Sequence, residues 1–190
     1  MRLSITSVLI PIAAVAKVRG PLIADEPEAP DPHYGVETLE WLVEVAPRQT
    51  ETLSGTVEQV YAQALQINTG FKLLPMLPQP PKETRGKIIC DIFPKSHALA
   101  IQDGINYLGR VPGRPKADPG PGRCARVSCS SNSAIWWCND DKKPQTLGGF
   151  GSIAGSAQAV LDQCSTQHSD LSGQRFEPGN WNTIVRKANC

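Results

Sequence analysis

The sequence is poor in aromatic residues, histidine and methionine, and it lacks the motifs of several common enzyme chemistries. Aromatic residues make up 6% of its 190 residues, and it has three histidines and two methionines. No GxSxG or HExxH motif occurs, nor a glycine loop followed by lysine and serine or threonine. The chain also contains no N-x-S/T sequon. These absences favour a non-catalytic protein, and we expect no cofactor.

The net charge is also small, but the charges are unevenly distributed. The formal net charge is +1. Residues 21–89 hold ten acidic and five basic side chains, whereas residues 90–190 hold eight acidic and eleven basic ones. No basic run with interleaved aromatic residues occurs, so we expect no nucleic-acid partner. The asymmetry suits an acidic pro-segment that covers a basic surface, but it also arises by chance, and no Lys-Arg processing pair marks the junction.

Long apolar runs are scarce, and the longest follows Arg2 at the N-terminus. It extends from Leu3 to Ala16 and ends in the small-x-small pattern Ala-Val-Ala. This pattern is typical of a secretory signal peptide, and we expect cleavage after Ala16. The alternatives are a buried helix or a membrane anchor, but the run is too short to span about 30 Å of hydrocarbon. We therefore expect a secreted, extracellular protein that is not an integral membrane protein.

Six cysteines are present, and all of them lie in residues 90–190. They are Cys90, Cys124, Cys129, Cys138, Cys164 and Cys190. An even number of cysteines in an exported chain indicates three disulfides, because oxidising compartments form and keep them. No CxxC pair occurs and the histidines complete no zinc-ligand pattern, so we expect no metal site.

Composition divides the chain into three segments. They are a signal peptide at 1–16, an acidic and partly disordered leader or pro-segment at 17–85, and a disulfide-bonded domain at 86–190. Within the leader, the proline-rich acidic residues 21–35 are expected to be disordered. Residues 36–45 suit a short helix or strand, and apolar residues recur at helical spacing over 52–66. The prolines of residues 73–82 mark the boundary with the domain.

Apolar patterns in the third segment predict the order βαββαβ. The strands are expected at 87–93, 125–130, 134–139 and 181–186, and the helices at 96–108 and 149–164. Ser96 is the expected N-cap of the first helix, which Gly109 ends. This order is the split βαβ motif. It predicts an α+β two-layer sandwich, in which a four-stranded antiparallel sheet carries both helices on one face.

The geometry of that sheet favours one disulfide pairing among the fifteen that six cysteines allow. The favoured pairs are Cys90 with Cys190, Cys124 with Cys138, and Cys129 with Cys164. Cys124 and Cys138 lie symmetrically across the predicted hairpin. The first strand begins beside the end of the last, which brings Cys90 near Cys190. Cys129 has the opposite parity to Cys124 and so faces the helices, where Cys164 ends the second helix.

Candidate binding residues come from the hairpin and from a basic loop. Trp136 and Trp137 alternate faces, so one belongs to the core and Trp136 faces outward opposite Arg126. An exposed tryptophan beside arginine is typical of a binding hot spot. The alternative is that residues 36–66 fold back and cover Trp136. The loop 110–123 adds basic candidates, with a merely solvated loop as the alternative; they are Arg110, Arg114, Lys116 and Arg123.

Two motifs carry a resemblance to a known family. Residues 124–140 (CARVSCSSNSAIWWCND) and 172–185 (SGQRFEPGNWNTIV), with the terminal Cys190, resemble small secreted cysteine-rich proteins of filamentous ascomycete fungi, many of them candidate effectors. The resemblance covers residues 88–190, and the architecture also looks like that of fungal and viral killer toxins. No toxin site motif aligns, so no toxin residue is carried over.

The resemblance implies a secreted, non-catalytic effector or a killer-toxin-like protein. Its partner would be an unknown protein or membrane component of a host or competitor. The alternative function is a secreted inhibitor of a host or competitor hydrolase, in which a rigid loop blocks the active site of the enzyme.

Overall fold

A six-stranded sheet forms the centre of the molecule. The computed structural model describes residues 28–75, 86–165 and 170–190, so the expected signal peptide lies outside the described residues. The strand order is β1-β7-β8-β12-β11-β4, and only β1 and β7 run parallel. The six strands are β1 (Gly35–Glu37), β4 (Lys87–Cys90), β7 (Arg123–Ser130), β8 (Ser133–Asn139), β11 (Gly173–Glu177) and β12 (Trp181–Lys187).

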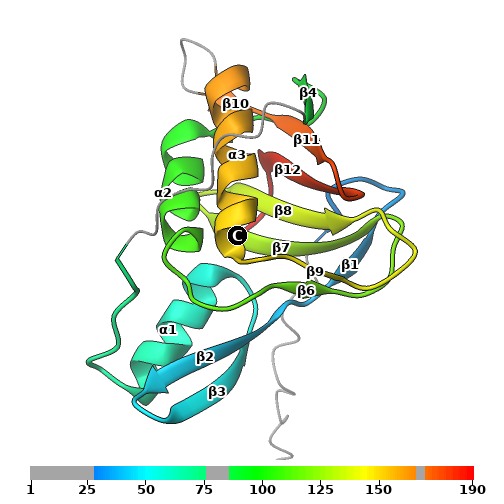
Figure 1. The fold of residues 1–190 in the computed structure, drawn as a ribbon. Coiled ribbons are helices and arrows are strands. Elements are labelled where there is room, and N and C mark those ends of the chain that lie inside the picture. Colours follow the sequence, from blue (N-terminus) through cyan, green and yellow to red (C-terminus); the bar gives the residue numbers. More distant parts are fainter. Residues whose placement is uncertain (1–27, 76–85, 166–169) are drawn as a thin grey trace, which may run out of the picture.

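Two helices, α2 (Ala98–Leu108) and α3 (Phe150–Cys164), cover one face of this sheet (Figure 1). The apolar side chains of α2 recur at helical spacing, and those of Ile101, Ile105 and Leu108 are at most 1% exposed. Gly109 ends α2 as predicted. The predicted α+β class is therefore confirmed. No helix within the described ranges is long and apolar enough to cross a membrane.

The predicted sheet of four antiparallel strands is wrong, because β11 and β1 were missed. β11 lies between β4 and β12, and β1 adds a parallel strand at the opposite edge. Neither has a strong sequence signal, because β1 has only three residues and β11 contains a glycine and several polar residues. Two of these polar residues, Arg175 and Glu177, pair at 2.7 Å between Nε and Oε1 with side chains at most 7% exposed. Pairing of the two charges compensates their burial, so β11 can lie inside the sheet.

Residues 40–67 form a hairpin and a helix that pack against the rest of the molecule. The elements are β2 (Glu40–Ala46), β3 (Gln49–Ser54) and α1 (Val57–Ile67). The Trp41 ring of β2 stacks on the Phe150 ring of α3, with centroids 4.1 Å apart. The helix expected at 52–66 begins later, because β3 continues to Ser54. The side chain of Gln59 accepts a hydrogen bond from the Thr56 N–H at 2.9 Å, which caps the helix start.

Two short ladders join the connecting segments. β5 (Ser96–His97) pairs with β10 (Asp170–Leu171), and β6 (Lys116–Ala117) pairs with β9 (Gln145–Thr146). Ser96 lies in β5 and does not cap α2 as predicted; its buried hydroxyl donates to the Leu171 carbonyl at 2.9 Å. The β6–β9 ladder anchors the proline-rich loop before β7 near its middle.

The outer face of the sheet, opposite α2 and α3, carries a second apolar cluster. Its fully buried members are Cys124, Ala134, Trp136, Cys138 and Ile184. Five partly buried side chains pack over them, namely Tyr34, Val36, Phe93, Cys129 and Ala188. Residues 30–36, which we call the N-terminal strap, are held on this face because the Arg186 guanidinium donates to the Pro30 carbonyl. Both faces of the sheet are therefore covered.

All six cysteines form disulfides, but two of the three predicted pairs are wrong. The bonds are Cys90–Cys164, Cys124–Cys138 and Cys129–Cys190. Cys124 and Cys138 lie opposite each other in the β7–β8 hairpin, as predicted. Cys90 pairs in register with Gly173 of β11, and a Cβ on that glycine would lie 3.0 Å from the Cys164 sulfur. The unpredicted strand β11 thus sets the position of Cys90 under the end of α3.

A β-bulge in β7 explains the error at Cys129. Arg126 pairs with Trp136 and Ser128 pairs with Ile135, so Val127 is an extra residue without a partner on β8. An extra residue reverses the alternation of side chains beyond it. Ser128 consequently faces α2, where a Cβ at Gly104 would lie 2.3 Å from its hydroxyl oxygen. Cys129 faces outward toward the C-terminal residue.

Candidate functional site

The predicted Trp136 and Arg126 pair lies together, but it forms part of the internal structure. Trp136 is fully buried, so it presents no surface to a partner. The Arg126 guanidinium lies 5.9 Å from the centroid of its ring, and Nη1 donates to the Asn189 carbonyl at 2.8 Å. Burial lowers the pKa of Arg126 from its usual value. The cover over Trp136 comes from the strap at Tyr34 and Val36 and from the C-terminal tail, not from residues 36–66 as a whole.

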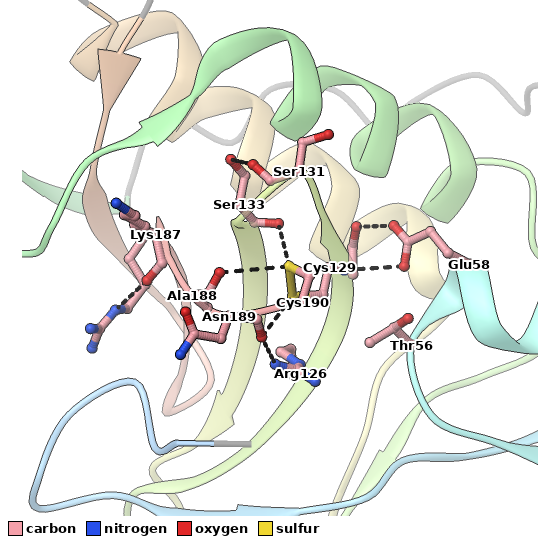
Figure 2. The surroundings of a disulfide bond; sticks show 12 residues. Thr56, Glu58, Arg126, Cys129, Ser131, Ser133, Lys187, Ala188, Asn189 and Cys190 are labelled. Carbon is pink, nitrogen blue, oxygen red and sulfur yellow. Dashed lines mark hydrogen bonds between the residues drawn. A yellow bond between two sulfur atoms is a disulfide. The ribbon is translucent and has the colours of Figure 1, made fainter. Parts of the chain in front are cut away.

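The same corner contains a contact that sequence reasoning missed. Figure 2 shows Glu58 of α1 reaching toward β7 beside the Cys129–Cys190 disulfide. One carboxylate oxygen accepts from the Ser128 hydroxyl, and the other accepts from the Cys129 N–H at 3.1 Å. The Ser128 hydroxyl and the Cys129 N–H follow the bulge, and the Glu58 carboxylate is the hydrogen-bond acceptor for both. A residue of the acidic leader is thus bound directly to the strand that carries two cysteines.

The four basic candidates from the loop do not converge on one surface. Arg110 donates to the Leu74 carbonyl at 2.9 Å, and Arg114 donates to the Leu147 carbonyl at 3.2 Å. Arg123 lies 3.5 Å from a Glu37 carboxylate oxygen. Each of these three guanidinium groups is already used within the chain. Lys116 lines an open cavity together with the Glu37 that Arg123 contacts.

This cavity, of about 470 Å³, lies between the start of the N-terminal hairpin and β6. We call it the acidic groove, and its lining residues are Glu37, Thr38, Glu40, Leu42, Thr52, Lys116 and Asp118. β1 and the residue after it supply Glu37 and Thr38, and the β2–β3 hairpin supplies Glu40, Leu42 and Thr52. Lys116 of β6 and the following Asp118 complete the lining. Three carboxylates therefore face one ammonium group across the groove.

Glu37 is the most constrained residue of the acidic groove. Its side chain is only 10% exposed. Oε2 accepts from the Asp118 N–H at 3.3 Å and lies near Arg123, whereas Oε1 is buried without a hydrogen-bond partner. Burial raises the pKa of the Glu37 carboxyl above its usual value, although these contacts oppose the shift. The groove thus contains one half-satisfied buried carboxylate.

A polar network on the outer sheet face is the second cluster of titratable groups. Asn182 donates to an Asp140 carboxylate oxygen at 2.7 Å, and Gln174 donates to the Tyr34 hydroxyl oxygen at 3.2 Å. Gln174 also donates to the Asn182 side-chain oxygen at 3.1 Å. Burial raises the pKa of both Asp140 and Tyr34. Each member has a partner, so the network serves to fix the strap on β11 and β12.

No pattern in the sequence predicted the acidic groove. Glu37 and Glu40 counted only as acids of the leader, and Asp118 lies about 80 residues away in a loop. Among the described residues, no three histidine, cysteine or acidic side chains are placed to hold a metal ion. Comparisons of the chain with protein-family models, curated proteins and solved structures found no match.

Proposed function

We propose that this protein is exported and acts by binding a molecule of a host or competitor, as an effector or killer-toxin-like protein without catalytic activity. The observation that carries the proposal is the use of all six cysteines in three disulfides. Reducing compartments keep such thiols free, whereas oxidising ones close them. The resemblance of residues 124–140 and 172–185 to secreted fungal proteins supports the same conclusion.

The intact mass of the protein recovered from culture medium tests export and oxidation together. We expect an N-terminus at Lys17, no alkylation of the native protein, and six alkylated thiols after reduction. A protein that keeps Met1 and reacts with alkylating reagent before reduction would rule out the proposal. A mass corresponding to a start near residue 85 would instead reveal processing of the leader.

The activity itself is tested by adding the pure oxidised protein to candidate target cells. We expect growth inhibition or cell death that the reduced and alkylated protein does not cause, because loss of the disulfides removes the fold. The reduced and alkylated protein comes from the same purified batch, so it is the matched control for purity and dose. Equal effects of both preparations would contradict a folded effector or toxin.

An inhibitor of a secreted hydrolase is the second candidate. The observation in its favour is the proline-rich loop before β7, which is fixed by the β6–β9 ladder and by the bond from Arg114 to Leu147. A preformed loop loses little conformational entropy when it binds. Stoichiometric inhibition of a protease or glycosidase, without any effect on cells, would favour this function over the first.

A further inference from the structure

We propose that the acidic groove binds a lysine or arginine side chain of the partner protein. This inference rests on the proposed function, since it names the chemistry by which the partner would be recognised. The groove has a built polar wall in Glu37 and an apolar surface beside it. It is separate from the disulfides and from the predicted Trp136 site.

Glu37 provides the first argument. One of its oxygens is engaged by the Asp118 N–H and by Arg123, but Oε1 is buried and has no hydrogen-bond partner. A buried charged acceptor without a donor is costly, and a donor from outside the chain removes that cost. Glu37 lines the acidic groove, so a ligand donor that enters the groove reaches Oε1 by displacing the atoms that cover it.

The charge balance of the groove provides the second argument. Glu40 and Asp118 are exposed at the groove together with Lys116, which forms no ion pair in the part of the chain that the structure describes. With Glu37, the lining carries three carboxylates and one ammonium group, and the Arg123 guanidinium beside Glu37 leaves one net negative charge. These carboxylates do not form a metal-binding group of three, so a small ion is not the matching ligand. A cation on a longer arm suits the opening better.

The apolar wall provides the third argument. Leu42 is 71% exposed although it lies in the middle of a strand, and it lines the groove beside Thr52, its partner on β3. Lysine and arginine combine an apolar stem with a charged end. The stem can pack on Leu42 while the charged end reaches Glu37. The apolar Leu42 and the acidic Glu37 are then both complementary to a lysine or arginine side chain.

In the test, N-acetyl-arginine amide is added as a minimal probe to the full-length oxidised protein. Its binding is measured from changes in the backbone amide NMR shifts of the protein. N-acetyl-citrulline amide is the matched probe, because it has nearly the same shape and no charge. We expect saturable shifts confined to amides of residues 35–42, 52 and 116–118 with the arginine probe. Equal shifts with both probes, or shifts elsewhere only, would overturn the proposal.

Two substitutions locate the binding energy. Glu37→Gln should weaken binding of the arginine probe by about tenfold or more, because it removes the buried charge. Glu40→Gln should weaken it by about two- to fivefold, as expected for an exposed charge. Asp103→Asn on α2 removes an equal charge far from the groove and should change nothing. If Glu37→Gln does not fold, Glu40→Gln still decides, and an unchanged dissociation constant would contradict the site.

Two further results separate this site from its alternatives. If Lys17→Gln or Arg19→Gln shifts the groove amides of the full chain without any probe, the occupant is the chain's own N-terminal segment and the partner proposal is wrong. If the protein from culture medium has free thiols, the proposed function fails, but the arginine titration is still read on the purified protein. Specific arginine binding would then support the groove alone.

Discussion

The two parts of this molecule are held by different means. Residues 86–190 contain all three disulfides, whereas residues 28–75 contain no cysteine. The N-terminal part is held by packing, hydrogen bonds and the ion pair of Glu37 with Arg123, and its Trp41, Val43 and Val57 are at most 2% exposed. They share one apolar cluster with α2 and α3. The change from an acidic to a basic composition near residue 90 therefore does not mark a boundary in the hydrophobic core.

Besides the hydrogen bonds at Pro30, Tyr34 and Leu74, three elements of the N-terminal part contact the C-terminal part. β1 pairs with β7, Trp41 stacks on Phe150, and Glu58 accepts hydrogen bonds at the bulge. Disulfides stabilise chiefly by restricting the unfolded chain, whereas packing stabilises the native state directly. We therefore expect reduction to act mainly through the unfolded chain and core substitution through the native state.

The largest expected effect is that of separating the two parts. After cleavage at a protease site placed in residues 76–85, we expect the fragments to stay together in native gel filtration, because residues 28–75 share the core. They should separate in denaturant without reductant, since no disulfide joins them. The C-terminal fragment alone should lack a cooperative unfolding transition. Cooperative unfolding of that fragment would show that it is an independent domain and would favour a removable pro-segment.

A single core substitution sharpens the comparison. Trp41→Ala should lower the free energy of unfolding by about 3–5 kcal/mol, because it leaves a cavity against Phe150. Leu42→Ala is the matched control on the next residue; its side chain is 71% exposed, so the change should stay within about 0.5 kcal/mol. Urea unfolding of the oxidised proteins measures both. Similar values for the two variants would mean that the N-terminal part is not packed as described.

The disulfides of the C-terminal part offer the next test. On the chain-entropy model, removing Cys129–Cys190, with a sequence separation of 61 residues, should cost about 4 kcal/mol. The double substitution Cys129→Ala and Cys190→Ala, followed by urea unfolding without reductant, measures this loss. Wild-type protein in reductant provides the comparison, and it should lose more, since all three bonds open. A loss below about 1 kcal/mol would contradict the expected constraint.

Tryptic mapping without reduction tests the pairing itself. The bonds predict one linked product of residues 124–126, 127–142 and 188–190, separate from the product that joins Cys90 to Cys164. The pairing favoured by sequence would instead link residues 188–190 to the peptide of Cys90. The two sets of masses differ, so one digest distinguishes them.

Local patterns account for what the sequence predicted. α3 falls within one residue of its expected range, and α2 ends at the expected Gly109. The Cys124–Cys138 bond lies within one local hairpin, although the turn register alone would place Cys124 opposite Asn139, and the bulge at Val127 brings it opposite Cys138. In each case the signal lies within about twenty residues, where periodicity and turn residues act.

The errors arose where distant residues decide the structure. The extra residue Val127 reverses the face of Cys129, and parity cannot reveal a bulge from sequence alone. β11 carries buried polar side chains whose partners exist only in the folded sheet. The acidic groove joins Glu37 to Asp118, and no local pattern relates two residues so far apart.

The hydrogen bonds at the junction predict a smaller effect. Glu58→Ala leaves the Ser128 hydroxyl and the Cys129 N–H without their acceptor, which should cost about 1–3 kcal/mol. Gln66→Ala, on the exposed side of the same helix, should change stability little. A double-mutant cycle with Ser128→Ala isolates the pair, and a coupling energy near zero would show that Glu58 does not bind the bulge.

The smallest effects concern pH, and each part of the molecule contributes one carboxyl. Burial raises the pKa of Glu37 and of Asp140, so the folded state holds these protons more tightly than the unfolded chain. Their contribution to stability therefore falls as pH rises from the usual carboxyl pKa through the raised value. Asp140→Asn and Glu37→Gln should each flatten this decline in urea unfolding measured across the acid range. Asp140→Asn should also lower the pKa of Tyr34, because Asp140 helps to raise it, whereas Glu37→Gln should leave that pKa unchanged.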